Sequence, residues 1–214
     1  MNLLVFDLDG TLIDSKLDLA HSVNAARNYM GLNPLEHELI YSYVGNGAPV
    51  LIRRALGADS SDSEVSSALD FFIRYYAQHC LDHTLLYPGV AEALERMCSS
   101  GMSLAVLTNK PVRISHQIIA GLGLSSRFFR VYGGNSFDQK KPDPIGIETL
   151  LNESGLAREG AFMVGDSAVD ILTARNARIR ACGVTYGFQP DSFKDAPPDL
   201  LVDDLGQLAD YLQI

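Results

Sequence analysis

The chain has 214 residues, of which 47% are apolar and 20% charged, so it is long enough to bury a full core in one or two domains. Its formal net charge of −9 argues against nucleic acid as a partner. Three widely spaced cysteines form no disulfide framework and no metal knuckle, and no apolar run is long enough to span a bilayer. The first apolar run ends at Asp7 without a basic region before it, so we expect no signal peptide and a cytoplasmic protein that binds neither nucleic acid nor membrane.

The first predicted element is a buried strand over residues 3–7, which runs into Asp7-Leu8-Asp9-Gly10-Thr11. Two carboxylates at the end of a central strand destabilise the fold unless a cation, a substrate or many hydrogen bonds compensate them. Gly10 permits a sharp turn, and Thr11 adds a hydroxyl to it. Acidic turns that bind calcium have a similar sequence, so this segment alone indicates a polar site without naming its ligand.

Residues 14–84 contain no convincing strand and separate the first strand from the other predicted strands. Helical patterns are predicted at about 16–30, 35–43, 46–56 and 62–82. We interpret this stretch as a helical cap inserted after the first strand, with hinges near 13–15 and 83–88. Because the first hinge adjoins Asp9, the cap is expected to act as a lid over the site.

Within the predicted cap, Asn46 and Gly47 precede a helix that carries Arg54. A glycine before a helix N-terminus suits the close approach of an anion, and a plain loop between helices is the alternative. His79 and His83 have the spacing of metal ligands but no third partner, so we do not assign them a metal. The apolar stripe near Phe72 is interpreted as packing.

Beyond the cap, strands alternate with helices. Strands are predicted at 103–108, 129–133, 161–165, 180–185 and 200–202, and helices at 88–100, 111–122, 143–154 and 167–177, with a last short helix at the C-terminal end. This alternation predicts an α/β fold, a doubly wound Rossmann-like parallel sheet formed by residues 1–13 and 85–214 around the cap at 14–84. Ligands of such sheets gather at the carboxyl ends of the strands.

Two further acids follow the predicted strand at 161–165. Asp166 lies at its end, and Asp170 lies one helical turn further on the same face. Both have an alternative role at a helix N-terminus, where acidic groups are favourable. Together with Asp7 and Asp9, however, four carboxylates would gather at one edge, and their mutual repulsion predicts a divalent ion. Oxygen ligands with few histidines favour Mg²⁺.

Two other residues are expected at the same edge. Thr108 ends the strand at 103–108, where a hydroxyl can donate to an anion or simply cap the next helix. Lys141 precedes Pro142 in a loop, where most lysines are solvated. Four nearby acids need a compensating cation, so we expect Lys141 to pair with one of them and with a phosphate oxygen.

Four blocks in this order resemble the haloacid dehalogenase superfamily of phosphohydrolases: DLDGT at 7–11, Thr108, Lys141 before proline and GDSxxD at 165–170. The resemblance covers essentially the whole chain and implies the α/β core with its helical cap. A narrower likeness to bacterial phosphoglycolate phosphatases comes from VGNGAPVLIRRAL at 44–56 and TNKP at 108–111.

The resemblance also implies roles. Asp7 would attack phosphorus to form an aspartyl-phosphate, and Asp9 would protonate the leaving group and later activate water. Mg²⁺ would be held by Asp7, the backbone carbonyl of Asp9, Asp166 and Asp170, the last as an inner or an outer ligand. The phosphoryl oxygens would contact Thr108, Asn109 and Lys141. The cap residues Asn46, Gly47 and Arg54 would contact the far end of a small phosphate ester such as 2-phosphoglycolate.

Several alternatives stay open at this point. The second acid, Asp9, argues against a dehalogenase, and the absence of lysine between Asp18 and His83 argues against a phosphonate hydrolase. A β-phosphoglucomutase, or a phosphatase of other small esters or of pyrophosphate, would share all four motifs. A non-catalytic binding protein on the same fold is disfavoured because it would be expected to lose Asp7 or Asp9.

Overall fold

The computed structural model describes residues 2–214 and divides the chain into two compact units. Unit 1 contains the chain up to Asp14 and again from Leu86 to Ile214, and unit 2 contains Ser15–Leu85. The chain passes between them at two short strands, β2 (Ile13–Asp14) and β3 (Leu85–Leu86), which pair with each other. No helix within residues 2–214 has the length and apolar character needed to cross a membrane.

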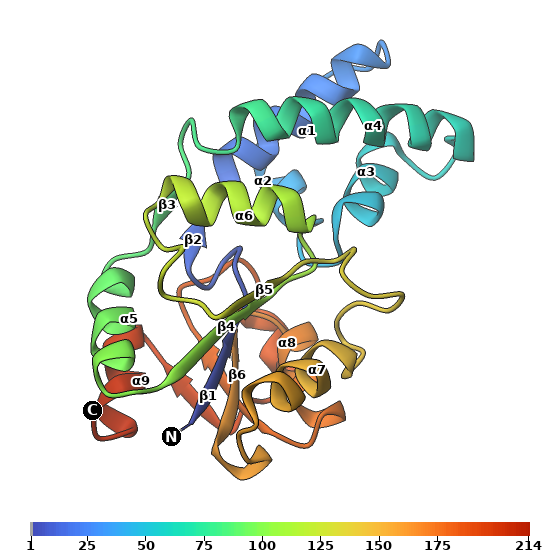
Figure 1. The fold of residues 1–214 in the computed structure, drawn as a ribbon. Coiled ribbons are helices and arrows are strands. Elements are labelled where there is room, and N and C mark those ends of the chain that lie inside the picture. Colours follow the sequence, from blue (N-terminus) through green and yellow to red (C-terminus); the bar gives the residue numbers. More distant parts are fainter. Residues whose placement is uncertain (1) are drawn as a thin grey trace. The chain divides into compact units, whose positions relative to one another are not determined.

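Unit 1 is built on a six-stranded sheet with the order β5-β4-β1-β6-β7-β8 (Figure 1). Its strands are β1 (Leu3–Phe6), β4 (Ser103–Leu107), β5 (Arg130–Tyr132), β6 (Ala161–Gly165), β7 (Arg180–Val184) and β8 (Leu200–Val202). Every pairing is parallel, which confirms the predicted doubly wound α/β core. Because β1 lies between β4 and β6, the residues that come directly after these three strands meet at one edge.

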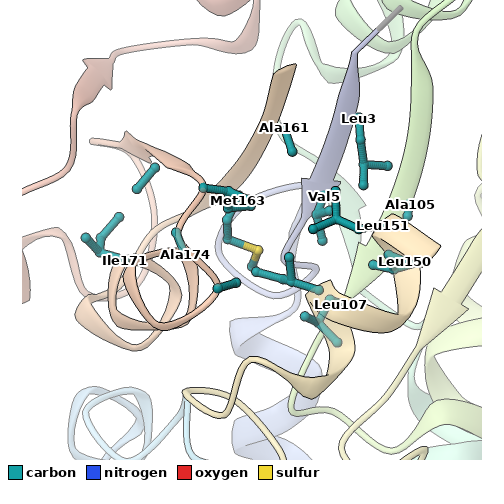
Figure 2. Close-up of a cluster of buried hydrophobic side chains, with 14 of the residues drawn as sticks. Leu3, Val5, Ala105, Leu107, Leu150, Leu151, Ala161, Met163, Ile171 and Ala174 are labelled. Atoms are coloured by element: carbon teal, nitrogen blue, oxygen red, sulfur yellow. The ribbon is translucent and has the colours of Figure 1, made fainter. Parts of the chain in front are cut away.

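Helices cover both faces of the sheet. They are α5 (Val90–Ser99), α6 (Val112–Gly121), α7 (Ile145–Ser154), α8 (Ala168–Asn176) and α9 (Leu205–Tyr211). Alternate strand residues such as Val5 and Met163 point toward α7 and α8 and form a continuous buried cluster with them (Figure 2). On the other face, Phe6 contacts Phe128 edge to face, and Phe162 contacts Tyr211. Burial on both faces explains why β1 is apolar throughout.

Unit 2 is helical, with α1 (Lys16–Tyr29), α2 (His37–Tyr41), α3 (Ala48–Leu56) and α4 (Asp62–His79). Helix α4 packs against α1 and α3 through buried side chains that include Phe72 and Tyr76. A capping box fixes its start, because Ser61 accepts from the N–H of Glu64 while the Glu64 carboxylate accepts from the N–H of Ser61.

Some elements differ from the sequence prediction for physical reasons. Helix α3 begins at Ala48 instead of residue 46 because Gly45 and Gly47 have φ values of +115° and +82°, which a helix does not allow. Helix α2 is only five residues long. The paired strands β2 and β3 were not predicted, since two residues carry no periodic pattern.

Candidate active site

Asp7 comes directly after β1 and lies at the carboxyl edge of the sheet. One of its carboxylate oxygens, Oδ1, accepts from the backbone N–H of Leu8 at 2.7 Å and from Lys141 Nζ at 2.9 Å. The side chain is 13% exposed, so it is largely withdrawn from water but still accessible from one side. A carboxylate in this position can contact a ligand, and its own hydration shell is incomplete.

Asp166 comes after β6, the strand next to β1, and is buried. Its Oδ2 accepts from the backbone N–H groups of Phe188 at 2.6 Å and Gln189 at 3.3 Å. Glycines allow this approach, because a Cβ atom on Gly10 or on Gly187 would overlap the Asp166 side chain. The turns after β1 and after β7 are therefore shaped around this carboxylate.

Asp170 lies in the first turn of α8 and is also buried. Its Oδ2 accepts from the backbone N–H of Ser167 at 3.1 Å and from Ser167 Oγ at 2.7 Å, which completes a capping box. Its Oδ1 accepts from Lys141 Nζ at 2.6 Å. Asp170 thus has the helix-capping role considered from the sequence and at the same time contacts the acidic cluster.

Lys141 joins two of these acids. Its side chain is 2% exposed, and its Nζ contacts both Asp7 and Asp170. Burial opposes the charged form, but the carboxylates of Asp170 and Asp7 outweigh it and raise the pKa of Lys141. Lys141 therefore stays an ammonium, and it occupies the position that the sequence argument expected for a compensating cation.

One lysine does not compensate all of this acidity. Burial raises the pKa of Asp7 to about 6, with Lys141 opposing the rise and Asp170 adding to it. Burial raises the pKa of Asp166 well above its usual value, and the charges of Asp170 and Asp7 add to the effect. Both carboxylates are thus destabilised as anions in the absence of a further cation.

The same three carboxylates fit a metal ion. Asp7, Asp166 and Asp170 each offer an oxygen, and these oxygens lie within 4.8 Å of one another. A cluster of carboxylate oxygens without nitrogen or sulfur ligands suits a hard cation such as Mg²⁺. The Asp9 carboxylate is not part of this group of oxygens.

Thr108 and Asn109 come after β4 on the other side of β1 and are buried. Thr108 Oγ1 accepts from the backbone N–H of Lys110 at 3.2 Å, and Asn109 Nδ2 donates to the carbonyl of Lys141 at 3.2 Å. The second bond ties the loop after β4 to the lysine loop. Thr108, Asn109 and Lys141 are therefore brought to the same edge as Asp7 and Asp166.

Asp9 has a partner that the sequence reasoning passed over. Lys110 Nζ donates to Asp9 Oδ1 at 2.7 Å, and the lysine side chain is only 3% exposed. The available signal was the TNKP segment, in which Lys110 stands next to Thr108 and Asn109 at a strand end. The Phe188 and Gln189 backbone donors were also missed, although their loop comes after β7 at the same edge.

The three predicted cap residues lie in unit 2. Asn46 and Gly47 form the approach to α3, and Arg54 lies in the last turn of that helix. Arg54 Nη1 donates weakly to the carbonyl of Tyr43 at 3.4 Å, and both residues line a surface pocket of unit 2. Their role toward a substrate stays a prediction.

Comparisons with known proteins identify the family of this chain. Residues 4–184 match the family model described as haloacid dehalogenase-like hydrolase. The chain therefore belongs to the haloacid dehalogenase-like hydrolases, as the four ordered motifs indicated.

Several individual relatives within this family are similar to the chain over most of its length. A phosphoglycolate phosphatase from Vibrio parahaemolyticus is 37% identical, and the alignment covers 100% of this chain and 97% of the relative. One from Pseudomonas fluorescens is 39% identical over 96% of this chain and 78% of the relative. The crystal structure of a predicted phosphoglycolate phosphatase from Haemophilus somnus superposes with a TM-score of 0.93 at 33% identity and covers 100% of this chain and 98% of that one. The chain is thus a hydrolase that resembles phosphoglycolate phosphatases over its full length.

Proposed function

We propose that this hydrolase is an Mg²⁺-dependent phosphomonoesterase that acts through an aspartyl-phosphate on Asp7, with 2-phosphoglycolate as its substrate. The observation that carries the proposal is the largely buried cluster of Asp7, Asp166 and Asp170 around Lys141. The excess negative charge of this cluster favours the binding of a divalent cation. The bound cation would in turn attract the phosphate group of a substrate. The names of the relatives support the substrate.

In the first step, a carboxylate oxygen of Asp7 forms a bond to phosphorus while the bond from phosphorus to the ester oxygen breaks. Asp9 gives its proton to the departing alkoxide. In the second step, water attacks the aspartyl-phosphate and passes a proton to the Asp9 carboxylate. The bond between Asp7 and phosphorus then breaks, which releases inorganic phosphate and restores both acids.

The remaining residues would bind the phosphoryl group and Mg²⁺ or orient the side chains that do so. Thr108, Asn109 and Lys141 would contact the phosphoryl oxygens, where their donors stabilise the negative charge of the transition state. Asp7 and Asp166 would hold Mg²⁺ directly, because the hydrogen bonds described for each engage one oxygen. Asp170 would act mainly by orienting Lys141, since both of its oxygens already accept hydrogen bonds. When bound, the ion supplies positive charge next to the reacting phosphoryl group.

We further propose that unit 2 serves as the substrate lid, with Asn46, Gly47 and Arg54 directed at the part of the substrate remote from phosphorus. The cap then contributes to the choice among esters, while unit 1 contributes the chemistry that they share.

A panel of phosphomonoesters tests this function. We expect kcat/KM to be highest for 2-phosphoglycolate, lower for sugar phosphates and pyrophosphate, and turnover to vanish in EDTA and return with added Mg²⁺. Asp7→Asn should abolish turnover of every ester while the circular dichroism spectrum stays unchanged. Metal-independent turnover, or an Asp7→Asn variant with near-normal activity, would refute the mechanism. A different preferred ester would refute the substrate alone.

A further inference from the structure

Lys110 is a buried cation placed beside the proposed proton donor instead of the nucleophile. It lies in the loop between β4 and α6, and its Nζ contacts Asp9 Oδ1 at 2.7 Å. The side chain is almost completely buried. Burying an ammonium group is unfavourable unless strong partners compensate it, so this position calls for a reason beyond surface solvation.

The two buried lysines of unit 1 serve different acids. Lys141 contacts Asp7 and Asp170, the side on which the phosphoryl group would be held. Lys110 contacts Asp9, whose carboxyl group must touch the ester oxygen in order to protonate it. Lys110 is therefore on the leaving-group side of the reaction, and Lys141 is on the phosphoryl side.

A lysine ammonium has three N–H donors, so a lysine that pairs with one carboxylate can also donate to other groups. In a 2-phosphooxy carboxylic acid, the carboxylate carbon is two bonds from the ester oxygen. A group that contacts the acid beside this oxygen is thus within reach of the substrate carboxylate. An alkyl phosphate without that carboxylate lacks the anionic group that Lys110 would bind.

We propose that Lys110 recognises the carboxylate of the substrate and selects 2-phosphooxy carboxylic acids, the class to which 2-phosphoglycolate belongs, over phosphate esters of neutral alcohols. This inference rests on the proposed function. It places a specificity determinant in the catalytic unit, in addition to the cap residues considered above.

Comparing 2-phosphoglycolate with ethyl phosphate tests the proposal, because the second ester keeps the two-carbon leaving group but lacks the carboxylate. We expect the wild-type enzyme to prefer 2-phosphoglycolate, and Lys110→Met to lower the ratio of the two kcat/KM values by about 10- to 100-fold, as the loss of a charged hydrogen bond implies. Lys110→Arg keeps the positive charge and should retain part of the preference. Lys194→Met is the matched control, since Lys194 is 80% exposed and should leave the ratio unchanged.

Product binding gives a second measurement. The inhibition constant of glycolate should rise in Lys110→Met, while that of inorganic phosphate should stay near the wild-type value. Circular dichroism and thermal unfolding establish that the variants are folded, and Lys110→Gln, which also removes the charge, provides the test if Lys110→Met is not.

The outcomes separate this inference from the proposed function. An equal loss of kcat/KM for both esters would mean that Lys110 only positions Asp9, and would overturn the proposal. A ratio that survives in Lys110→Met but collapses in Arg54→Met would assign the carboxylate to the cap and overturn it as well. A wild-type enzyme without preference for 2-phosphoglycolate would refute the proposed substrate itself.

Discussion

Two aspartates that are largely withdrawn from water, one in each unit, have opposite electrostatic surroundings. Asp18 of α1 accepts from the backbone N–H groups of His83 and Thr84, from Thr84 Oγ1 and from the His83 ring. Although burial works against the anion, these donors outweigh it and lower the pKa of Asp18. Asp7 in unit 1 shares a single lysine with Asp170, and burial raises its pKa to about 6.

The difference separates an acid whose charge the fold compensates from acids whose charge it does not. Asp18 is satisfied by its own unit and ties α1 to the segment after α4. The donors to Asp7 and Asp166 do not outweigh burial, so the pKa of each of these carboxyl groups is raised instead of lowered. Evolution retains such a destabilising arrangement where binding or catalysis needs it.

Removing Lys141 should have the largest effect. Lys141→Met leaves two carboxylates without their shared cation, and we expect it to lower the free energy of unfolding by about 3–5 kcal/mol at pH 7 in EDTA. Activity should disappear with it. Urea titration followed by circular dichroism measures the loss, and a loss below about 1 kcal/mol would contradict the buried ion-pair network.

Neutralising Asp7 should have the reverse effect on stability. Its folded-state pKa of about 6 lies above the value of 3.8 for an unperturbed aspartate, so its contribution to stability is present below pH 3.8 and is lost as the pH rises through about 6. At pH 8 in EDTA, Asp7→Asn should therefore have a free energy of unfolding up to about 3 kcal/mol higher than that of the wild type. The variant should accordingly unfold at a higher urea concentration. The gain should shrink toward pH 4, and it should shrink with added Mg²⁺ because the proposed metal binding would stabilise the wild type. Equal stability at pH 8 would mean that Asp7 is already compensated.

Asp18→Asn should destabilise the protein, because an amide cannot accept all four of the hydrogen bonds that the carboxylate receives. We expect a loss of about 2 kcal/mol at pH 7. The pKa of Asp18 is lower in the folded state than in the unfolded state. Its contribution to the free energy of unfolding is therefore fully present above about pH 4, and it is lost as the pH falls through the folded-state pKa. Urea titrations at pH 7 and pH 3 should show the gap between variant and wild type narrowing in acid, and a constant gap would exclude this charge effect.

Breaking an exposed pair in unit 2 should have the smallest effect. Arg53 and Asp62 form an ion pair with side chains 41% and 98% exposed, which water and salt screen. Asp62→Asn should change the free energy of unfolding by less than about 1 kcal/mol. If Asp62→Asn lowered the free energy of unfolding as much as Asp18→Asn, the exposure of an aspartate would not determine how much its charge contributes to stability.

The sequence predicted the edge at which Asp7, Thr108 and Asp166 meet because parallel strands bring their carboxyl ends together. Lys141 was predicted from the need for a cation, and Pro142 indicated that it lies in a loop. Contacts that depend on loop conformation could not be predicted from the sequence. The pairing of Lys110 with Asp9 joins residues 101 positions apart, and the donors of Phe188 to Asp166 are backbone groups that no side-chain pattern reveals.

The proposed mechanism requires that Asp7 becomes phosphorylated during turnover. A single turnover of 2-phosphoglycolate with Mg²⁺, quenched in acid within milliseconds and analysed by peptide mass spectrometry, tests it most directly. We predict a transient phosphoryl group on the peptide that contains Asp7, absent from Asp7→Asn and lost at the rate at which phosphate appears. A phosphoryl group on another residue, or turnover at full rate with no modified Asp7 at any time, would contradict the mechanism.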